Sequence, residues 1–431
     1  MQPRPQPGVL FLIAALAAAS MWFYVDRILV AFQVADAAAH ERPRGNLSDL
    51  YPRWLGAREL LLHHRNPYGD DITLEIQKGY YGRVLDPSRP NDPKDQQGFA
   101  YPVYVVFPLA PFVRFPFHSV QLVFYWLLFG LTAMSVWLWL CVLRWRLPAV
   151  ATASCIVLTL GSFPAVQGIK LQQLSLLVSA LLAGAVACVA SGFLFCGGVL
   201  LAAATIKPQL AWPLVAWLSV WAFSDWRNRR GLLFGFGLVM ALLLAGAEII
   251  LPGWWWMFAK ALGQYHRYTQ NQSVLLIPWA FSGILVATAV LACGFFLWKL
   301  RGEPADAENF GLATSLVLAL TVLVVPMYAP YNQVLLLPAI LELARDRTFL
   351  TSRSPLIRSL YPAGAFAFAW QWIASLSLSG AYLIGLRAWA VSAWNWPFFA
   401  TFFLPVFVFA LILLDVHLRG ASREPKGSAV N

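Results

Sequence analysis

The acidic residues of this chain are concentrated in one segment, which limits where a carboxylate could do chemistry. Eleven of the 20 Asp and Glu residues lie in residues 26–95, and none lies in residues 96–224. Within the acidic segment, Asp49 stands directly before Leu50-Tyr51-Pro52, where an apolar helical pattern begins. A carboxylate held there could accept a proton from a hydroxyl and act as a general base. It could equally cap the helix, because acids favour a helix N-terminus.

Isolated basic residues near apolar segments are the second group of candidates. Lys207 lies between two short apolar runs, where an ammonium is costly unless it meets an anion or reaches the membrane interface. Lys170 is placed similarly. His266 and Arg267 lie in a polar stretch, and a guanidinium forks onto phosphate oxygens. We expect these residues to contact a phosphate or a sugar; a polar surface loop remains the alternative for His266 and Arg267.

Other side chains indicate sugar contact rather than metal chemistry. Tyr331 and Asn332 flank a helix end interrupted by proline and could contact a sugar. His63 and His64 lack a carboxylate or Cys at ligand spacing, so no metal site is expected. No nucleotide-binding P-loop or GxGxxG motif is present. We therefore expect no cofactor, no metal ion and no nucleic-acid partner.

A short amphipathic helix is predicted directly after Asp49. Pro52 suits a first helical residue, and Trp54, Ala57 and Leu61 form an apolar stripe. The pattern places the polar side chains of this helix on its other side: Arg53, Glu59, His63 and His64. Asn66-Pro67-Tyr68-Gly69 ends the helix as a turn. Such a helix lies on a membrane surface, whereas residues 86–98 have the composition of a mobile polar loop.

Composition predicts an integral membrane protein that consists of helices. Hydrophobic residues make up 59% of the chain and charged residues only 12%, with a mean hydropathy of +0.63. A soluble domain carries about 25% charged residues. About twelve long apolar runs follow one another, which predicts an all-α polytopic bundle of about twelve transmembrane helices over residues 1–431 as a single domain.

Basic clusters predict the orientation of this bundle, because Lys and Arg favour cytoplasmic loops. Fifteen of the 31 basic residues form clusters near residues 4, 144–146, 227–230, 299–301, 345–358 and 419–426. If all of these are inside, both termini are inside and residues 35–117 form a long first periplasmic loop. Phe99–Phe117 is apolar but contains four prolines, so we expect it to be juxtamembrane or re-entrant rather than a crossing.

The predicted spans follow from this arrangement. The first covers residues 8–25 and is expected to remain uncleaved. The others are roughly 118–143, 148–165, 171–190, 193–206, 208–223, 231–251, 274–298, 310–326, 331–344, 355–384 and 395–415.

Several motifs of the first 230 residues resemble a known family. They are Asp49 before a Leu-rich helix that ends in Asn66-Pro67-Tyr68, then Tyr101-Pro102, Gln172-Gln173-Leu174-Ser175, and Lys207-Pro208-Gln209. Together they resemble the GT-C superfamily of membrane glycosyltransferases, and most closely glycosyltransferase family 87, which includes polyprenyl-phosphate-mannose-dependent mannosyltransferases. The chain departs from the family where Tyr-Pro-Pro and Gly-Gln-x-Asn are usual.

The resemblance implies a function and a place. It implies inverting transfer of mannose, another hexose or a pentose from a polyprenyl-phosphate donor to a lipid or glycan acceptor, with Asp49 as general base. Basic residues, of which Lys207 matches a family motif, would hold the donor phosphate. The enzyme would lie in a bacterial inner membrane among its lipids, with a periplasmic active site. A lipid or glycan transporter, or a polymerase or ligase of lipid-linked glycans, remains an alternative.

Overall fold

The computed structural model describes residues 7–269, 279–325 and 329–421. These residues form helices without β-strands, and helix accounts for 79% of the structure. The predicted all-α class is therefore confirmed. The chain begins with one long helical rod in which α1 (Pro7–Tyr24) continues through the π-helical turn η1 (Val25–Leu29) into α2 (Val30–Ala39).

Short helices follow before the chain returns into the bundle. They are α3 (Tyr51–His63), α4 (Asp70–Tyr81), η2 (Val103–Val105), α5 (Val106–Leu109) and η3 (Ala110–Phe112). The apolar stretch of residues 103–112 is too short to cross a membrane core of about 30 Å at about 1.5 Å per residue. It packs instead against α3.

The remaining helices make up the bundle and its connections. They are α6 (Phe117–Val142), α7 (Ala149–Leu160), α8 (Phe163–Lys170), α9 (Leu174–Ala190), α10 (Leu194–Ala204), α11 (Pro208–Ser224), α12 (Trp226–Ile250), α13 (Trp254–Thr269), α14 (Trp279–Leu300), α15 (Glu308–Val324), η4 (Pro330–Leu336), α16 (Leu337–Arg345), α17 (Arg347–Arg353), α18 (Pro355–Leu383), α19 (Arg387–Ser392) and α20 (Phe398–Ala421).

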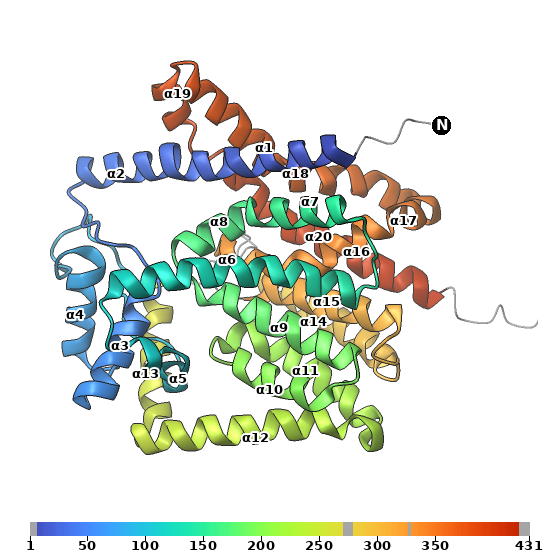
Figure 1. The fold of residues 1–431 in the computed structure, drawn as a ribbon, viewed down its shortest axis with the longest axis horizontal. Helices are drawn as coiled ribbons and strands as arrows, with labels where there is room; N and C mark the ends of the chain where they lie inside the picture. Colours follow the sequence, from blue (N-terminus) through green and yellow to red (C-terminus); the bar gives the residue numbers. More distant parts are fainter. Residues whose placement is uncertain (1–6, 270–278, 326–328, 422–431) are drawn as a thin grey trace, which may run out of the picture.

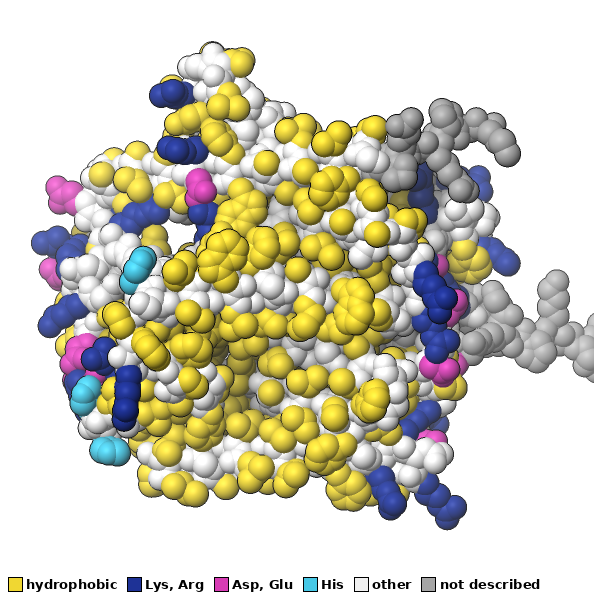
Figure 2. All heavy atoms as spheres, viewed as in Figure 1, with side chains coloured by type: hydrophobic (Ala, Val, Ile, Leu, Met, Phe, Trp, Pro, Cys, Tyr) yellow, Lys and Arg dark blue, Asp and Glu magenta, His cyan; other side chains and the backbone are white. Residues whose placement is uncertain are grey.

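The long helices lie side by side between two distinct ends of the molecule (Figure 1). Helices α3, α4, α5 and α13 gather at one end, which we name the loop end. At the other end lie α17, the start of α1 and the last turn of α20. Figure 2 shows hydrophobic side chains over the middle of the visible face, while Lys, Arg, Asp and Glu gather near both ends. This banding is what a protein embedded in a bilayer requires.

Fewer helices qualify as independent spans than the sequence predicts. Within the described residues, four helical stretches are long and apolar enough to cross a membrane: Gly8–Ala39, Phe117–Val142, Trp226–Ile250 and Phe398–Arg419. A fifth would be α7 with α8, which meet at an angle of 59°. Ser162 caps α8 by accepting from the Ala165 N–H at 3.4 Å, and Pro164 follows at its first turn. The number of twelve crossings therefore remains a prediction.

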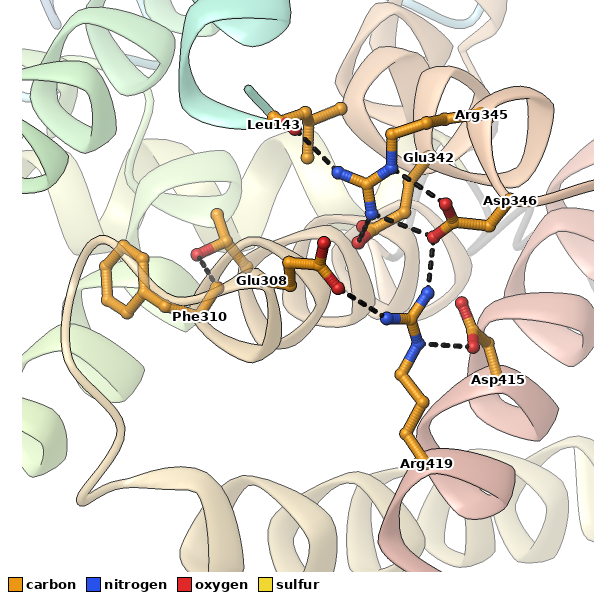
Figure 3. Close-up of polar contacts among 9 residues, drawn as sticks. Leu143, Glu308, Phe310, Glu342, Arg345, Asp346, Asp415 and Arg419 are labelled. Atoms are coloured by element: carbon orange, nitrogen blue, oxygen red, sulfur yellow. Dashed lines mark hydrogen bonds and ion pairs between the residues drawn. The ribbon is translucent and has the colours of Figure 1, made fainter. Parts of the chain in front are cut away.

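A network of ion pairs, most of them partly buried, joins the end opposite the loop end, and we name it the paired end (Figure 3). Arg345 pairs with Glu342 at 3.4 Å and with Asp346 at 2.8 Å. Arg419 pairs with Asp346, with Asp415 at 2.8 Å and with Glu308 at 3.0 Å. Because these residues come from α15, α16 and α20, the network joins three helices of the bundle.

Candidate functional site

Asp49 lies between three parts of the loop end that are distant in sequence. Its backbone N–H donates to the carbonyl of Leu171 at 2.9 Å. Its Oδ1 accepts from the Tyr80 hydroxyl of α4 at 3.1 Å, and its Oδ2 accepts from Nε2 of Gln173. The first residue outside α3 is Leu50, and no side chain caps that helix. Asp49 is therefore not a helix cap; its carboxylate faces α4 and the turn before α9.

The surroundings of Asp49 change its acidity. Burial raises the pKa of its carboxyl group, because a carboxylate loses hydration there. The charge of Arg53, the hydrogen bonds from Gln173 and Tyr80, and the charge of Lys207 all act in the opposite direction, and burial outweighs them. A raised pKa makes a carboxylate a stronger base, which is the property required of a group that removes a hydroxyl proton.

A strained turn between α8 and α9 presents Gln173 to Asp49. Gln172 takes a left-handed conformation with φ of 48°, and its side chain holds the turn in place. Its Nε2 donates to the carbonyls of Ile169 at 2.9 Å and Lys170 at 2.7 Å, while its Oε1 accepts from the Ser48 hydroxyl at 2.6 Å. Ser48 is the residue before Asp49. The turn and the catalytic candidate are thus fixed to each other.

Lys207 completes the site from the turn between α10 and α11. Only 6% of the residue is exposed, so its ammonium does not reach the membrane surface. Its Nζ donates to the Ser175 hydroxyl at 2.5 Å and to Oε1 of Gln173 at 3.3 Å. The amide of Gln173 therefore bridges the two charges: its nitrogen donates to Asp49 and its oxygen accepts from Lys207.

Tyr331 and Asn332 of η4 border the same ammonium. Nζ of Lys207 lies 5.1 Å from the centre of the Tyr331 ring, within the range of a cation–π contact. The Ser175 hydroxyl, which accepts from Lys207, donates in turn to Oδ1 of Asn332 at 2.8 Å. Burial lowers the pKa of Lys207, since a charged ammonium is poorly hydrated here. The site thus contains a cation whose charge would be stabilised by an anion.

Arg53 is a member of this site that the sequence pattern did not include. The residue is only 9% exposed. Its NH1 donates to the backbone carbonyl of Asp49 at 3.0 Å, its guanidinium lies 4.4 Å from the Tyr101 ring centre, and its Nε has no partner among the described residues. The spacing of four residues from Asp49 was the available signal, because one helical turn separates them.

Two other predicted residues are placed elsewhere. Lys170 pairs with Asp26 and lies 5.7 Å from the Trp22 ring centre, so its ammonium faces η1 rather than Asp49. Arg267 on α13 is exposed and borders a separate cavity at the loop end. His266 belongs to the same helix, but its side chain lies outside the described residues.

The segment predicted to be a mobile polar loop makes specific side-chain contacts. Arg83 forms a two-pronged contact with Asp92, at 2.8 and 2.6 Å. The Tyr81 hydroxyl donates to the Asp95 carbonyl at 2.8 Å, and burial raises the pKa of the Asp95 carboxyl group. The charges of Asp95 and Arg53 influence each other. Asp95 therefore forms part of the surroundings of the site.

No metal-binding arrangement was found within the described residues. In residues 7–269, 279–325 and 329–421, no group of three or more His, Cys, Asp or Glu side chains could hold an ion.

Comparison with known proteins gives one clear result. The profile of glycosyltransferase family 87 matches residues 99–326, which is more than half of the chain. The chain belongs to glycosyltransferase family 87. It is therefore a membrane glycosyltransferase. No curated protein and no solved structure matches it.

The family match covers only one side of the site. Tyr101, Gln173 and Lys207 lie within the matched residues, whereas Asp49 and Arg53 precede them. The resemblance noted in the sequence began earlier and ended near residue 230. The family assignment thus rests on the segment that supplies Lys207, and the geometry of the loop end connects Asp49 to that segment.

Proposed function

We propose that this protein transfers a sugar from a polyprenyl-phosphate donor to a hydroxyl of a lipid or glycan acceptor, with inversion at the anomeric carbon. The observation that carries the proposal is the Gln173 bridge, which holds a carboxylate and a buried ammonium on opposite ends of one amide. Such an arrangement provides a base and an anion-binding cation within one site.

The chemistry assigns a role to each charge. Asp49 takes the proton of the acceptor hydroxyl as its oxygen forms a bond to the anomeric carbon. The bond from that carbon to the phosphate oxygen breaks, and the polyprenyl phosphate leaves with the electron pair. Lys207 binds the phosphate, whose negative charge grows as the bond breaks. A contact that strengthens in the transition state accelerates turnover.

Arg53 supports the same assignment. Its buried guanidinium and the ammonium of Lys207 repel each other, since the charge of Arg53 lowers the pKa of Lys207. No carboxylate of the described residues lies within 4.0 Å of either cation. A phosphate placed between them would satisfy both, and the free Nε–H of Arg53 would gain an acceptor.

The orientation in the membrane is part of the proposal. We assign the loop end to the periplasmic side of a bacterial inner membrane and the paired end to the cytoplasm, with about twelve crossings and residues 35–117 outside. The support is that basic clusters meet at the paired end, where Arg345 also donates to the carbonyl of Leu143 at 2.6 Å. A reporter fused near Gln121 should read as periplasmic and one near Arg146 as cytoplasmic; a cytoplasmic Gln121 fusion would contradict this orientation.

The central experiment is a transfer assay with defined donors. Purified protein in nanodiscs is incubated with polyprenyl-phosphate mannose, glucose or arabinose and a membrane lipid extract as the acceptor source. Mass spectrometry of the lipid fraction should show one acceptor mass increased by one sugar residue. Asp49→Asn serves as the inactive control and Glu248→Gln as the matched one, because Glu248 is exposed and accepts from the Gly253 N–H. Product formation by Asp49→Asn would contradict the proposed mechanism.

A further inference from the structure

A polar cavity lies at the loop end, next to residues that surround Asp49. It has a volume of about 270 Å³ and is formed by α4, α13 and the segment between residues 96 and 100. Thr73 and Asp70 line it from α4, Gln264 and Arg267 from α13, and Gln96 from the connecting segment. The mechanism proposed above uses none of these side chains.

The cavity shares walls with the catalytic site. Tyr265 lines the cavity, and its phenol lies among the charges of Asp95, Arg53 and Asp49, which all influence its pKa. Tyr68 also lines the cavity, and its hydroxyl donates to the backbone carbonyl of Tyr101 at 2.6 Å. The Arg53 guanidinium packs on the Tyr101 ring. Tyr265 and Tyr68 therefore connect the cavity directly to the surroundings of Asp49.

The lining has the chemistry of a carbohydrate site. Two amides, a hydroxyl, a carboxylate and a guanidinium supply both donors and acceptors, which suits the many hydroxyls of a sugar. Tyr68, Phe99 and Tyr265 supply aromatic surface for the apolar faces of a sugar ring. Pockets for drug-sized ligands measure roughly 300–1,000 Å³, so this smaller cavity suits a single ring.

The position of Arg267 separates this cavity from the donor phosphate. The guanidinium is exposed and borders the cavity, whereas Lys207 is buried, donates to Gln173 and is not among the residues that line the cavity. The two cations that the sequence assigned to one phosphate therefore border different spaces.

We propose that this cavity binds the sugar or polyol headgroup of the acceptor, with Gln264, Thr73 and Arg267 holding its hydroxyl groups. The proposal rests on the transferase function proposed above and specifies the acceptor as a lipid or glycan that presents one carbohydrate ring. A bound ring would direct one hydroxyl past Tyr265 toward Asp49, and the donor would approach from the Lys207 side.

The test measures sugar binding without any donor, so it does not depend on catalysis. Protein in nanodiscs is mixed with methyl glycosides of mannose, glucose, galactose and arabinose and with myo-inositol, and saturation-transfer NMR reports which probes bind. In the wild type, we expect the NMR signal of at least one probe to show saturation transfer, which reports binding. Gln264→Trp, which fills the cavity, should abolish it, and Arg267→Ala and Thr73→Val should each weaken it at least threefold. Lys260→Ala, an exposed change on α13, should leave it unchanged.

Each outcome either supports or overturns the assignment. Loss of binding in Gln264→Trp and its retention in Lys207→Ala place the carbohydrate in this cavity. The assignment is overturned if no probe binds to the wild type in the NMR experiment. It is also overturned if binding survives in Gln264→Trp and disappears in Lys207→Ala. The lipid transfer assay separates the two proposals: sugar transfer that proceeds normally in Gln264→Trp contradicts the acceptor cavity alone, whereas transfer by Asp49→Asn contradicts the mechanism.

Discussion

The paired end and the site around Asp49 use their basic residues in opposite ways. At the paired end, Arg345 and Arg419 each contact two or more carboxylates within 3.4 Å. In the site around Asp49, Lys207 and Arg53 are more deeply buried, yet they contact hydroxyl, amide and carbonyl oxygens. A closed ion-pair network stabilises an arrangement of helices. Buried cations that have no carboxylate at ion-pair distance are instead suited to bind an anion from outside.

The base should show the largest effect on turnover. Asp49→Asn keeps the size and the hydrogen-bonding shape but cannot accept a proton, and general-base catalysis contributes about 10²- to 10⁴-fold. We expect kcat to fall by at least about 10²-fold while donor binding and thermal midpoint stay close to wild type, measured by the lipid assay and by a thermal shift. A variant with unchanged kcat would remove Asp49 from the chemistry.

The unpaired cation should show the next largest effect. Loss of one group that stabilises developing negative charge costs roughly 10²- to 10³-fold in kcat, so Lys207→Ala should slow turnover in that range. Lys170→Ala is the matched comparison at the same end, since that ammonium is already paired with Asp26. Steady-state kinetics with equal losses in both variants would contradict the distinction between paired and unpaired cations.

The acid limb of the pH profile should reveal the hydrogen bonds to the base. Transfer requires Asp49 as a carboxylate, and burial raises its pKa, so kcat/KM should fall as pH decreases through a value above the usual 3.9 or so for Asp. Tyr80→Phe removes a donor that stabilises the charged form, and the midpoint should move upward by roughly half a pH unit to one. Tyr81→Phe, whose hydroxyl contacts Asp95 instead, is the control; a downward shift in Tyr80→Phe would be inconsistent.

The paired end should affect stability and leave turnover nearly unchanged. Arg419→Gln leaves Asp415, which is 0% exposed, without its charged partner. Removing one partner of a buried pair costs about 3–5 kcal/mol, and partial exposure of Arg419 reduces that cost. We expect the thermal midpoint to fall by several degrees while kcat per folded molecule stays within about twofold of wild type. A large loss of kcat in a fully folded sample would contradict the assignment of a purely structural role to the paired end.

The helical class and part of the site could be predicted because they follow from composition and local pattern. Long runs of high hydropathy predict helices, because a helix pairs its backbone N–H and C=O groups within one segment in lipid. Asp49, Lys207, Tyr331 and Asn332 were identified from their residue types near chain breaks, and the fold brings all four around Gln173 and Ser175.

The remainder depends on side-chain direction, which periodicity alone does not give. Arg53 was placed on the polar side of α3 and assigned no role, but its guanidinium packs on the Tyr101 ring beside Asp49. Lys170 and Lys207 look alike in sequence, yet one ammonium faces Asp26 and the other faces Ser175. The ordered segment around Asp92 and Asp95 was missed because a paired Arg83 cannot be recognised from polar composition.

Gln173 has an evolutionary consequence. An amide carries no charge, so it can contact Asp49 and Lys207 together without neutralising either. The codons for Gln and Glu differ by a single base, and a Glu at this position would place a second carboxylate against Asp49 and give Lys207 a permanent counter-ion. One point mutation would thus convert the open site into a closed ion pair like those of the paired end. A descendant protein could lose catalysis and keep the fold through this single substitution.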